Sequence, residues 1–247
     1  MITVSIIVPA YNEEKTIIPL LNQVAGQTIE GVKFEVIVVD DGSSDGTLDL
    51  LNKAPDLYTK LIVLKKNGGK GKAVQAGIRA ASGQYILFQD ADLEYNPAEY
   101  SALLFPVKEF EACVVIGSRF LSPRYTRVSY FWHKVGNRLI TFIFNLLNNT
   151  TFTDIYSCYL LYKRELVDPE SLTTFGWEQH AEILSKAVRN GSIFYEIPIS
   201  YHGRSYGEGK KIRGYHIIAV LWTIIVKRIM PRRSLKRRAS PEISTRY

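Results

Sequence analysis

Residues 85–92 read Tyr-Ile-Leu-Phe-Gln-Asp-Ala-Asp, an apolar run of strand length that leads into two aspartates separated by one alanine. A similar junction lies at residues 36–43, where Val-Ile-Val-Val leads into Asp-Asp-Gly-Ser. Ligands of open α/β sheets bind at the carboxyl ends of the strands. The two junctions therefore predict acidic side chains in one crevice at the edge of a sheet.

The rest of the first half repeats this alternation of short apolar runs and helical patterns. Further apolar runs lie at residues 4–8, 61–64 and 112–116. Apolar residues recur with helical spacing between the runs, at residues 14–25, 46–51, 72–81 and 97–108. This order predicts an α/β fold, a Rossmann-like, mostly parallel sheet flanked by helices.

The second half is less regular. The sequence predicts a helical stretch at 131–147, strands at 159–162 and 194–197, and a helix at 178–189 between them. Residues 202–211 contain three glycines and three cations, which is typical of a loop that contacts phosphate.

The C-terminal part combines an apolar segment with positive charge. Residues 215–230 predict an amphipathic helix, interfacial or packed on the core, because a membrane crossing needs about 20 apolar residues. Eight basic residues and one acid follow from residue 227 onward, which accounts for the whole formal charge of +7. A neutral globule with a cationic tail favours an anionic membrane surface. The apolar start has no basic leader, so we expect a cytoplasmic protein, peripherally bound to the cytoplasmic face of the membrane.

Asp90 and Asp92 have the chemistry of a metal site. Carboxylates on alternate residues can converge on Mg²⁺ or Mn²⁺, which also accepts diphosphate oxygens. Such an ion neutralises the charge that builds on a diphosphate leaving group. Asp-x-Asp pairs are common on protein surfaces, and the buried strand before this pair is what favours the metal site.

Two other nucleotide-binding classes are excluded by pattern. Residues 66–73 read Lys-Asn-Gly-Gly-Lys-Gly-Lys-Ala, which lacks the first glycine of a phosphate loop and has Ala73 where Ser or Thr would bind magnesium. No Gly-x-Gly-x-x-Gly follows the first strand, which argues against a dinucleotide oxidoreductase. The lysines remain suited to phosphates at a helix N-terminus.

Four motifs in a fixed order resemble glycosyltransferase family 2. They are Val-Pro-Ala-Tyr-Asn-Glu at 8–13, Asp-Asp-Gly-Ser at 40–43, Asn-Gly-Gly-Lys-Gly at 67–71 and Asp-Ala-Asp at 90–92. Within that family the chain resembles the dolichyl-phosphate mannose synthase-like branch of polyprenyl-phosphate glycosyltransferases. Later segments agree with this branch, namely residues 117–120, 154–157, 196–199 and 204–211, together with Glu182.

The resemblance implies a GT-A type fold and a set of site residues. The nucleotide-sugar would contact Pro9, Ala10, Tyr11, Glu13, Asp40, Lys70, Asp90, Ala91 and Asp92. The metal ligands would be Asp90, Asp92 and Glu94. The residues that act in catalysis or bind phosphate would be Asp92, Arg119, Asp154, Glu182, Arg204 and Lys211.

The acceptor is less well defined by the resemblance. Residues 154–159 lack the glycine usual in the branch, and His180 stands where an aspartate is frequent. A hydroxyl acceptor would need a general base, for which Asp154 and Glu182 are candidates. A polyprenyl phosphate is already largely anionic, with a second pKa of about 6, and needs cations instead.

We therefore expect inverting transfer of a hexose from GDP-mannose or UDP-glucose to dolichyl or undecaprenyl phosphate. The alternatives are a cell-wall, lipid-linked saccharide or polysaccharide acceptor, and, ranked low, a non-catalytic protein that binds nucleic acid. No nucleic-acid partner is expected, because the tail lacks interleaved aromatic residues. The expected parts are a catalytic domain at 1–212, with a nucleotide-sugar half at about 1–120 and an acceptor half at about 121–212. An interfacial helix at 213–230 and a basic, disordered tail at 231–247 follow.

Overall fold

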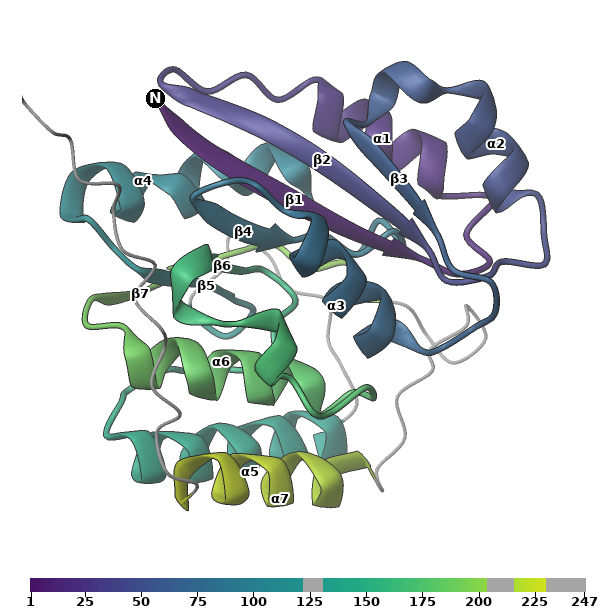
Figure 1. Cartoon of the computed structure of the whole chain (residues 1–247). Coiled ribbons are helices and arrows are strands. Elements are labelled where there is room, and N and C mark those ends of the chain that lie inside the picture. Colours follow the sequence, from purple (N-terminus) through teal and green to yellow (C-terminus); the bar gives the residue numbers. More distant parts are fainter. Residues whose placement is uncertain (122–130, 204–215, 230–247) are drawn as a thin grey trace, which may run out of the picture.

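The computed structural model describes residues 1–121, 131–203 and 216–229 (Figure 1). The described part forms a seven-stranded sheet with the strand order β3-β2-β1-β4-β6-β5-β7. The strands are β1 (Ile2–Ala10), β2 (Val32–Asp40), β3 (Lys60–Val63), β4 (Tyr85–Phe88), β5 (Val114–Ser118), β6 (Leu160–Lys163) and β7 (Phe194–Pro198). Strand β6 runs antiparallel to both of its neighbours, and all the other pairs are parallel. The expected mostly parallel sheet is confirmed.

Helices cover both faces of the sheet (Figure 1). They are α1 (Ile17–Ala25), α2 (Thr47–Lys53), α3 (Lys70–Ala80), α4 (Tyr100–Phe110), α5 (Phe131–Asn148), α6 (Gln179–Asn190) and α7 (His216–Ile229). Short 3-10 helices are η1 (Pro55–Leu57), η2 (Pro97–Glu99), η3 (Arg164–Leu166) and η4 (Pro169–Ser171). The predicted helix at 97–108 begins instead at Tyr100, because Pro97 starts the 3-10 turn η2.

The core is built from the β-branched and aliphatic side chains of the central strands. Residues 36–39 of β2 and 85–88 of β4 are buried throughout, which suits strands covered by helices on both faces. Glu35 is the polar exception in β2. Its carboxylate accepts hydrogen bonds from Ser5 in β1, Lys60 in β3 and Ser82 ahead of β4, so one side chain joins three strand segments.

The order of the strands places a crevice beside β1. The chain passes from β1 to β2 and β3 on one side, and then returns to β4 on the other side. Loops after β1 and β4 therefore leave in different directions, and ligands of open α/β sheets bind at such a switch point. Both acidic junctions, after β2 and after β4, lie at this edge of the sheet.

Helix α7 is the expected C-terminal amphipathic helix. Val220 and Ile224 are buried against the domain, while Trp222 is 68% exposed. The helix contacts α5 and α6. In the described ranges, no helix has the length and apolar character that a membrane crossing requires. The predicted tail at 231–247 lies outside the described residues.

Candidate active site

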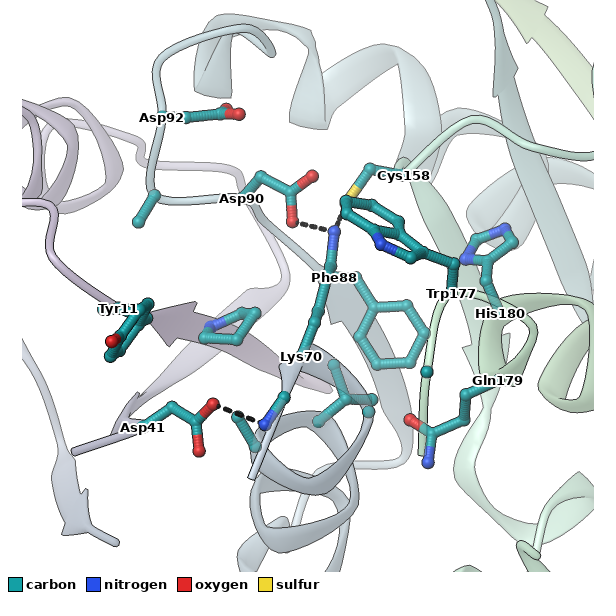
Figure 2. Close-up of a pocket in the computed structure, with 18 of the residues that line it drawn as sticks. Tyr11, Asp41, Lys70, Phe88, Asp90, Asp92, Cys158, Trp177, Gln179 and His180 are labelled. Atoms are coloured by element: carbon teal, nitrogen blue, oxygen red, sulfur yellow. Dashed lines mark hydrogen bonds and ion pairs between the residues drawn. The ribbon is translucent and has the colours of Figure 1, made fainter. Parts of the chain in front are cut away.

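A pocket of about 470 Å³ opens at the carboxyl ends of β1, β2 and β4. Strand ends, the start of α3 and the segment before α6 all contribute to its wall. Its lining includes Pro9, Ala10, Tyr11, Glu13, Asp41, Lys70, Phe88, Asp90, Ala91, Asp92, Glu94, Arg119, Tyr156, Cys158, Trp177, Gln179, His180 and Tyr201. Figure 2 shows these elements converging from both halves of the chain.

The buried amide of Gln89 fixes the start of the acidic segment. Its Nε2 donates to the carbonyl oxygen of Asp90 at 3.1 Å, and its Oε1 accepts from the hydroxyls of Tyr100 and Tyr159, both at 2.8 Å. A side chain with no exposed surface and all these partners holds the backbone of Asp90 in one position. The side chain of Asp90 is thereby aimed into the pocket.

Lys70 supplies a cation at the centre of the pocket. It is the first residue of α3, and its Nζ lies 2.5 Å from Oδ1 of Asp90. The same ammonium lies 3.9 Å from Sγ of Cys158 and 5.7 Å from the centre of the Trp177 ring (Figure 2). Although burial disfavours the charged form, Asp90 raises the pKa of Lys70, so the ammonium stays charged.

The acidic segment carries more negative charge than Lys70 balances. Burial, together with Asp90 and Glu94, raises the pKa of Asp92 to about 7. A divalent cation beside Asp90 and Asp92 would relieve this repulsion. Among the described residues, no three His, Cys, Asp or Glu side chains form a complete metal cage. The carboxylates of Asp90 and Asp92, both in the pocket lining, suit a hard ion that takes its remaining ligands from phosphate and water.

Glu94, the further metal ligand expected, has a second partner. Its Oε2 accepts a hydrogen bond from the Tyr201 hydroxyl at 2.7 Å, and its backbone N–H donates to Asp92 at 3.2 Å. Glu94 thus links the acidic segment to Tyr201, three residues after the end of β7.

The end of the pocket beside β1 contains four residues that the resemblance assigned to the nucleotide-sugar, together with Asp41 after β2. Pro9, Ala10, Tyr11 and Glu13 all line the pocket, and so does Asp41. Asp41 accepts hydrogen bonds from the backbone N–H groups of Gly68 and Gly69 at 2.8 and 2.9 Å. It therefore holds the glycine loop against the pocket.

Asp40 does not line the pocket, contrary to its expected place. It is 1% exposed, and its Oδ2 accepts from the backbone N–H of Ser43 at 3.2 Å, which is the turn-forming contact that its sequence context also allowed. Its Oδ1 is buried and accepts no hydrogen bond from the described part of the chain.

The inner end of the pocket is aromatic. Phe88, Trp177 and Tyr156 surround His180, whose ring lies 5.8 Å from Tyr156 and 6.5 Å from Phe88. Burial, with Lys70 nearby, lowers the pKa of His180 to about 4, so the ring is neutral at pH 7. Its Nε2 is buried without a hydrogen-bond partner among the residues the structure describes.

Arg119 lines the pocket with its guanidinium held in place. Its Nε and Nη2 lie 2.7 and 2.9 Å from the two carboxylate oxygens of Asp154. The group also lies 5.0 Å from the centre of the Tyr201 ring. A bidentate pair fixes the plane of the guanidinium, and Nη2 also donates to the carbonyl oxygen of Tyr156 at 3.2 Å.

The expected places of Asp154 and Glu182 are corrected by the structure. Asp154 is fully buried as the partner of Arg119. Glu182 is fully buried as well, and pairs with Lys186 at 3.0 Å and with Lys227 at 2.7 Å. Neither residue lines the pocket, and a carboxylate already paired with cations is a poor base.

Arg204 and Lys211, the other two predicted phosphate-binding residues, lie outside the described residues. Sequence reasoning overlooked Cys158 and Trp177, and it assigned Asp40 rather than Asp41 to the nucleotide-sugar. Asp41 was part of a quoted motif, but the pattern did not say which of two adjacent aspartates faces the pocket. Trp177 and Cys158 carry no local signal, because the pocket wall they form comes from separate loops.

Comparison with known proteins identifies the family. The model described as glycosyl transferase family 2 matches residues 5–169. The chain belongs to glycosyltransferase family 2, as the sequence motifs predicted.

Two curated relatives carry the same description. The undecaprenyl-phosphate 4-deoxy-4-formamido-L-arabinose transferase of Proteus mirabilis (strain HI4320) is 30% identical over 216 residues, covering 84% of this chain and 62% of that protein. The protein of the same name from Enterobacter sp. (strain 638) is 30% identical over 212 residues, with the same coverage of 84% and 62%. The chain thus spans 62% of the length of these relatives.

Solved structures share the fold at lower identity. Glucosyl-3-phosphoglycerate synthase from Mycobacterium tuberculosis, in complex with Mn²⁺, UDP and phosphoglyceric acid, superposes with a TM-score of 0.68 at 21% identity, covering 94% of this chain and 80% of that one. TarS of S. aureus, in complex with UDP-GlcNAc, gives 0.62 at 21% identity, covering 91% and 66%. The GT-A type fold expected from the sequence is confirmed.

Proposed function

We propose that this protein is an inverting glycosyltransferase that moves a sugar from a nucleotide-diphosphate donor to a polyprenyl phosphate at a membrane surface. The observation that carries the proposal is the pocket at the switch point. It combines Asp90, Asp92, Lys70 and Arg119, all partly exposed, within one cavity. Membership of family 2 supports sugar transfer as the reaction.

The donor would lie across the pocket from β1 to α6. Pro9, Ala10, Tyr11 and Glu13 would contact the nucleoside, whereas Asp40, which is 1% exposed and does not line the pocket, would support the turn after β2. Asp90 and Asp92 would hold Mg²⁺ or Mn²⁺, which when bound neutralises the diphosphate leaving group. Lys70 would contact the same phosphates from the other side. GDP-mannose and UDP-glucose remain the proposed donors.

The state of the carboxylates favours a phosphate acceptor. Attack by a sugar hydroxyl requires a base that removes its proton, whereas a phosphate monoester is already anionic. Asp154 and Glu182, the two candidate bases, are buried in ion pairs outside the pocket lining. Arg119 is held in the pocket wall and would position an acceptor phosphate, assisted by Arg204 and Lys211. The description of both curated relatives, which names undecaprenyl phosphate, agrees with this acceptor.

The test is sugar transfer from a panel of GDP- and UDP-sugars, with Mn²⁺ or Mg²⁺, to a short-chain polyprenyl phosphate, with the product identified by mass spectrometry. We expect the Asp92→Ala variant and the chelated wild type to lose activity by at least about a hundredfold. Asp49→Ala removes an exposed acid on α2 and is the matched control. Undiminished activity of Asp92→Ala would remove the metal bridge from the mechanism. A product formed only with saccharide acceptors would reassign the chain to the alternative acceptor class.

A further inference from the structure

Helices α5 and α7 form one outer surface of the molecule. They lie side by side, with α6 between them and the sheet (Figure 1). Their backbones approach closely at Gly136 of α5, where an added Cβ would lie 2.8 Å from Cδ1 of Ile217 in α7. The two helices therefore act as one packed pair.

The outward side of α5 is apolar. Gly136, Ile140 and Phe144 face the protein and are buried. The opposite side carries a second apolar stripe at helical spacing, made of Phe131, Val135, Leu139, Phe142 and Leu146 with Trp132 beside it. The exposed fraction of these side chains lies between 39% for Val135 and 76% for Trp132. A helix that only covers a core carries polar residues on its outer face.

Helix α7 extends this surface. Ile218, Trp222 and Ile229 are 74%, 68% and 77% exposed. Large contiguous apolar patches on a water-exposed surface mark sites of contact with membranes or other macromolecules. We call the exposed apolar side chains of both helices the α5–α7 face, composed of Phe131, Trp132, Val135, Leu139, Phe142, Leu146, Ile218, Trp222 and Ile229.

The formally charged side chains of the described helices α5 and α7 are all positive. Neither helix contains an aspartate or a glutamate. Lys134 and Arg138 of α5 and Arg228 of α7 are exposed beside the apolar residues. The sequence that follows α7 adds five cations between residues 232 and 238. An apolar face with a cationic border complements the interface of an anionic lipid leaflet.

We propose that the α5–α7 face is the membrane-docking surface of this protein, with both helices lying along the surface of an anionic leaflet. Helices of 18 and 14 residues are about 27 and 21 Å long, and each carries exposed apolar side chains on the side opposite its buried residues. Two tryptophans on that side suit the headgroup boundary. A second copy of the chain would bring two cationic borders together, which opposes self-association through this face.

This inference deepens the proposed function, because a lipid-linked acceptor lies in the same leaflet that the face would bind. It adds α5 to the membrane contact that the sequence assigned to the C-terminal helix and tail alone. It also explains why α7 both packs on the domain and exposes Trp222: one side serves attachment, and the other serves docking.

The test measures sedimentation of the whole chain with vesicles of phosphatidylcholine alone, or mixed equally with phosphatidylglycerol. We expect binding to the mixed vesicles, and at least about tenfold weaker binding for Leu139→Glu and for Trp222→Glu. The matched control is Phe105→Glu, which places the same charge on a 56% exposed aromatic of α4. Circular dichroism melting checks that each variant folds.

Three results would overturn the inference. They are unchanged vesicle binding in both variants, an equal loss in Phe105→Glu, or a dimer of the wild type that Leu139→Glu dissociates in light scattering. Brominated lipids give an independent readout, since they should quench emission in the wild type and quench it less in a double Trp132→Phe, Trp222→Phe variant.

Transfer assays separate this inference from the proposed reaction. Leu139→Glu should retain transfer to a short-chain, water-dispersed polyprenyl phosphate and lose transfer to the same lipid class in mixed vesicles. Absence of transfer by the wild type with either acceptor would refute the reaction, while the vesicle-binding comparison would still decide the docking surface.

Discussion

At the scale of single residues, the polar atoms of the pocket differ in whether they already have a hydrogen-bond or ion-pair partner within the protein. The carboxylate of Asp41 accepts hydrogen bonds from two backbone N–H groups, and that of Asp154 forms an ion pair with Arg119. Asp90 pairs with Lys70, and burial together with the negative charges of Asp90 and Glu94 raises the pKa of Asp92. His180 keeps an unpartnered nitrogen at the inner end. The unsatisfied atoms are the ones available to a ligand, because buried polar atoms are rarely left unpaired.

His180 should contact the sugar rather than the nucleotide. The ring is neutral, and its hydrogen bond with the backbone of Ile155 leaves Nε2 as an acceptor. A sugar hydroxyl can donate to that nitrogen, whereas a phosphate oxygen has no proton to donate. We expect His180→Phe to weaken binding of the nucleotide-sugar about tenfold, the effect of one lost hydrogen bond.

Calorimetry with two ligands tests this assignment. Binding of the nucleoside diphosphate alone should be unchanged in His180→Phe, and binding of the complete nucleotide-sugar should fall. An equal loss for both ligands would show that the histidine acts through the fold of the pocket and not through the sugar.

At the scale of elements, the pocket depends on how α3 meets the segment before α6. The backbone N–H of Gly71 donates to the carbonyl oxygen of Phe175 at 3.1 Å. A Cβ on Gly71 would lie 2.3 Å from that oxygen, so only glycine permits the contact. The wall that contains Trp177 is therefore set by a residue more than a hundred positions earlier in the chain.

Gly71→Ala should displace the segment around Phe175 and open the inner end of the pocket. We expect a loss of donor binding of about tenfold or more and a lower melting temperature, because the backbone atom that clashes cannot rotate away. Gly26→Ala is the control, since its Cβ would lie 3.4 Å from the nearest atom. Equal behaviour of the two variants would contradict this account.

Glu182 should act as an anchor for α7 and not as a base. Lys227 of α7 reaches both Glu182 and Thr173 at 2.7 Å, which ties the helix to α6 and to the segment before it. We expect Glu182→Gln to raise amide hydrogen exchange in α7 and to lower the stability of the chain, because it leaves a buried ammonium poorly paired.

The activity of Glu182→Gln separates the two roles. Transfer to a dispersed polyprenyl phosphate should stay within about a few-fold of the wild type, whereas loss of a general base costs typically a hundredfold or more. A loss of that size with unchanged exchange in α7 would restore Glu182 as a base.

At the scale of the whole molecule, two buried carboxylates make the free energy of unfolding depend on pH in the acidic range. Burial alone would raise the pKa of Glu35, but hydrogen bonds from Lys60, Ser5 and Ser82 lower it to about 2. Burial would also raise the pKa of Glu182. Hydrogen bonds from Lys227, Thr174 and Lys186 outweigh this effect and lower the pKa to about 2. Both groups hold fewer protons in the folded state than in the unfolded state between these values and the ordinary pKa of 4.5.

The free energy of unfolding should therefore be fully retained above about pH 5 and fall as the pH drops from 4.5 toward 2. Each carboxylate should account for a loss on the order of 1 to 3 kcal/mol. Urea unfolding across this range checks the trend. Glu35→Gln should be less stable at neutral pH and show a shallower acid dependence, and an unchanged dependence would contradict the role of Glu35.

The sequence by itself determined the strand and helix order, the sheet class, the acidic strand ends and the family. These features are local: an apolar run, a following aspartate or a motif depends on neighbours within a few residues. The strand end after β4 predicted the place of Asp90 and Asp92 in the pocket, and the family resemblance implied those of Pro9, Tyr11 and Glu13.

Only the tertiary structure decided which polar groups face the pocket and which form hydrogen bonds or ion pairs that stabilise the fold. Asp40 and Asp41 are adjacent in sequence, yet only Asp41 lines the pocket, because successive side chains at a strand end point to opposite sides. Asp154 and Glu182 are candidate bases by motif and ion-pair partners by position, since Arg119 and Lys227 reach them from distant elements. The outer side of α5 is likewise defined by packing: an amphipathic pattern shows that a helix has an apolar side, and only its neighbours show which apolar side remains exposed.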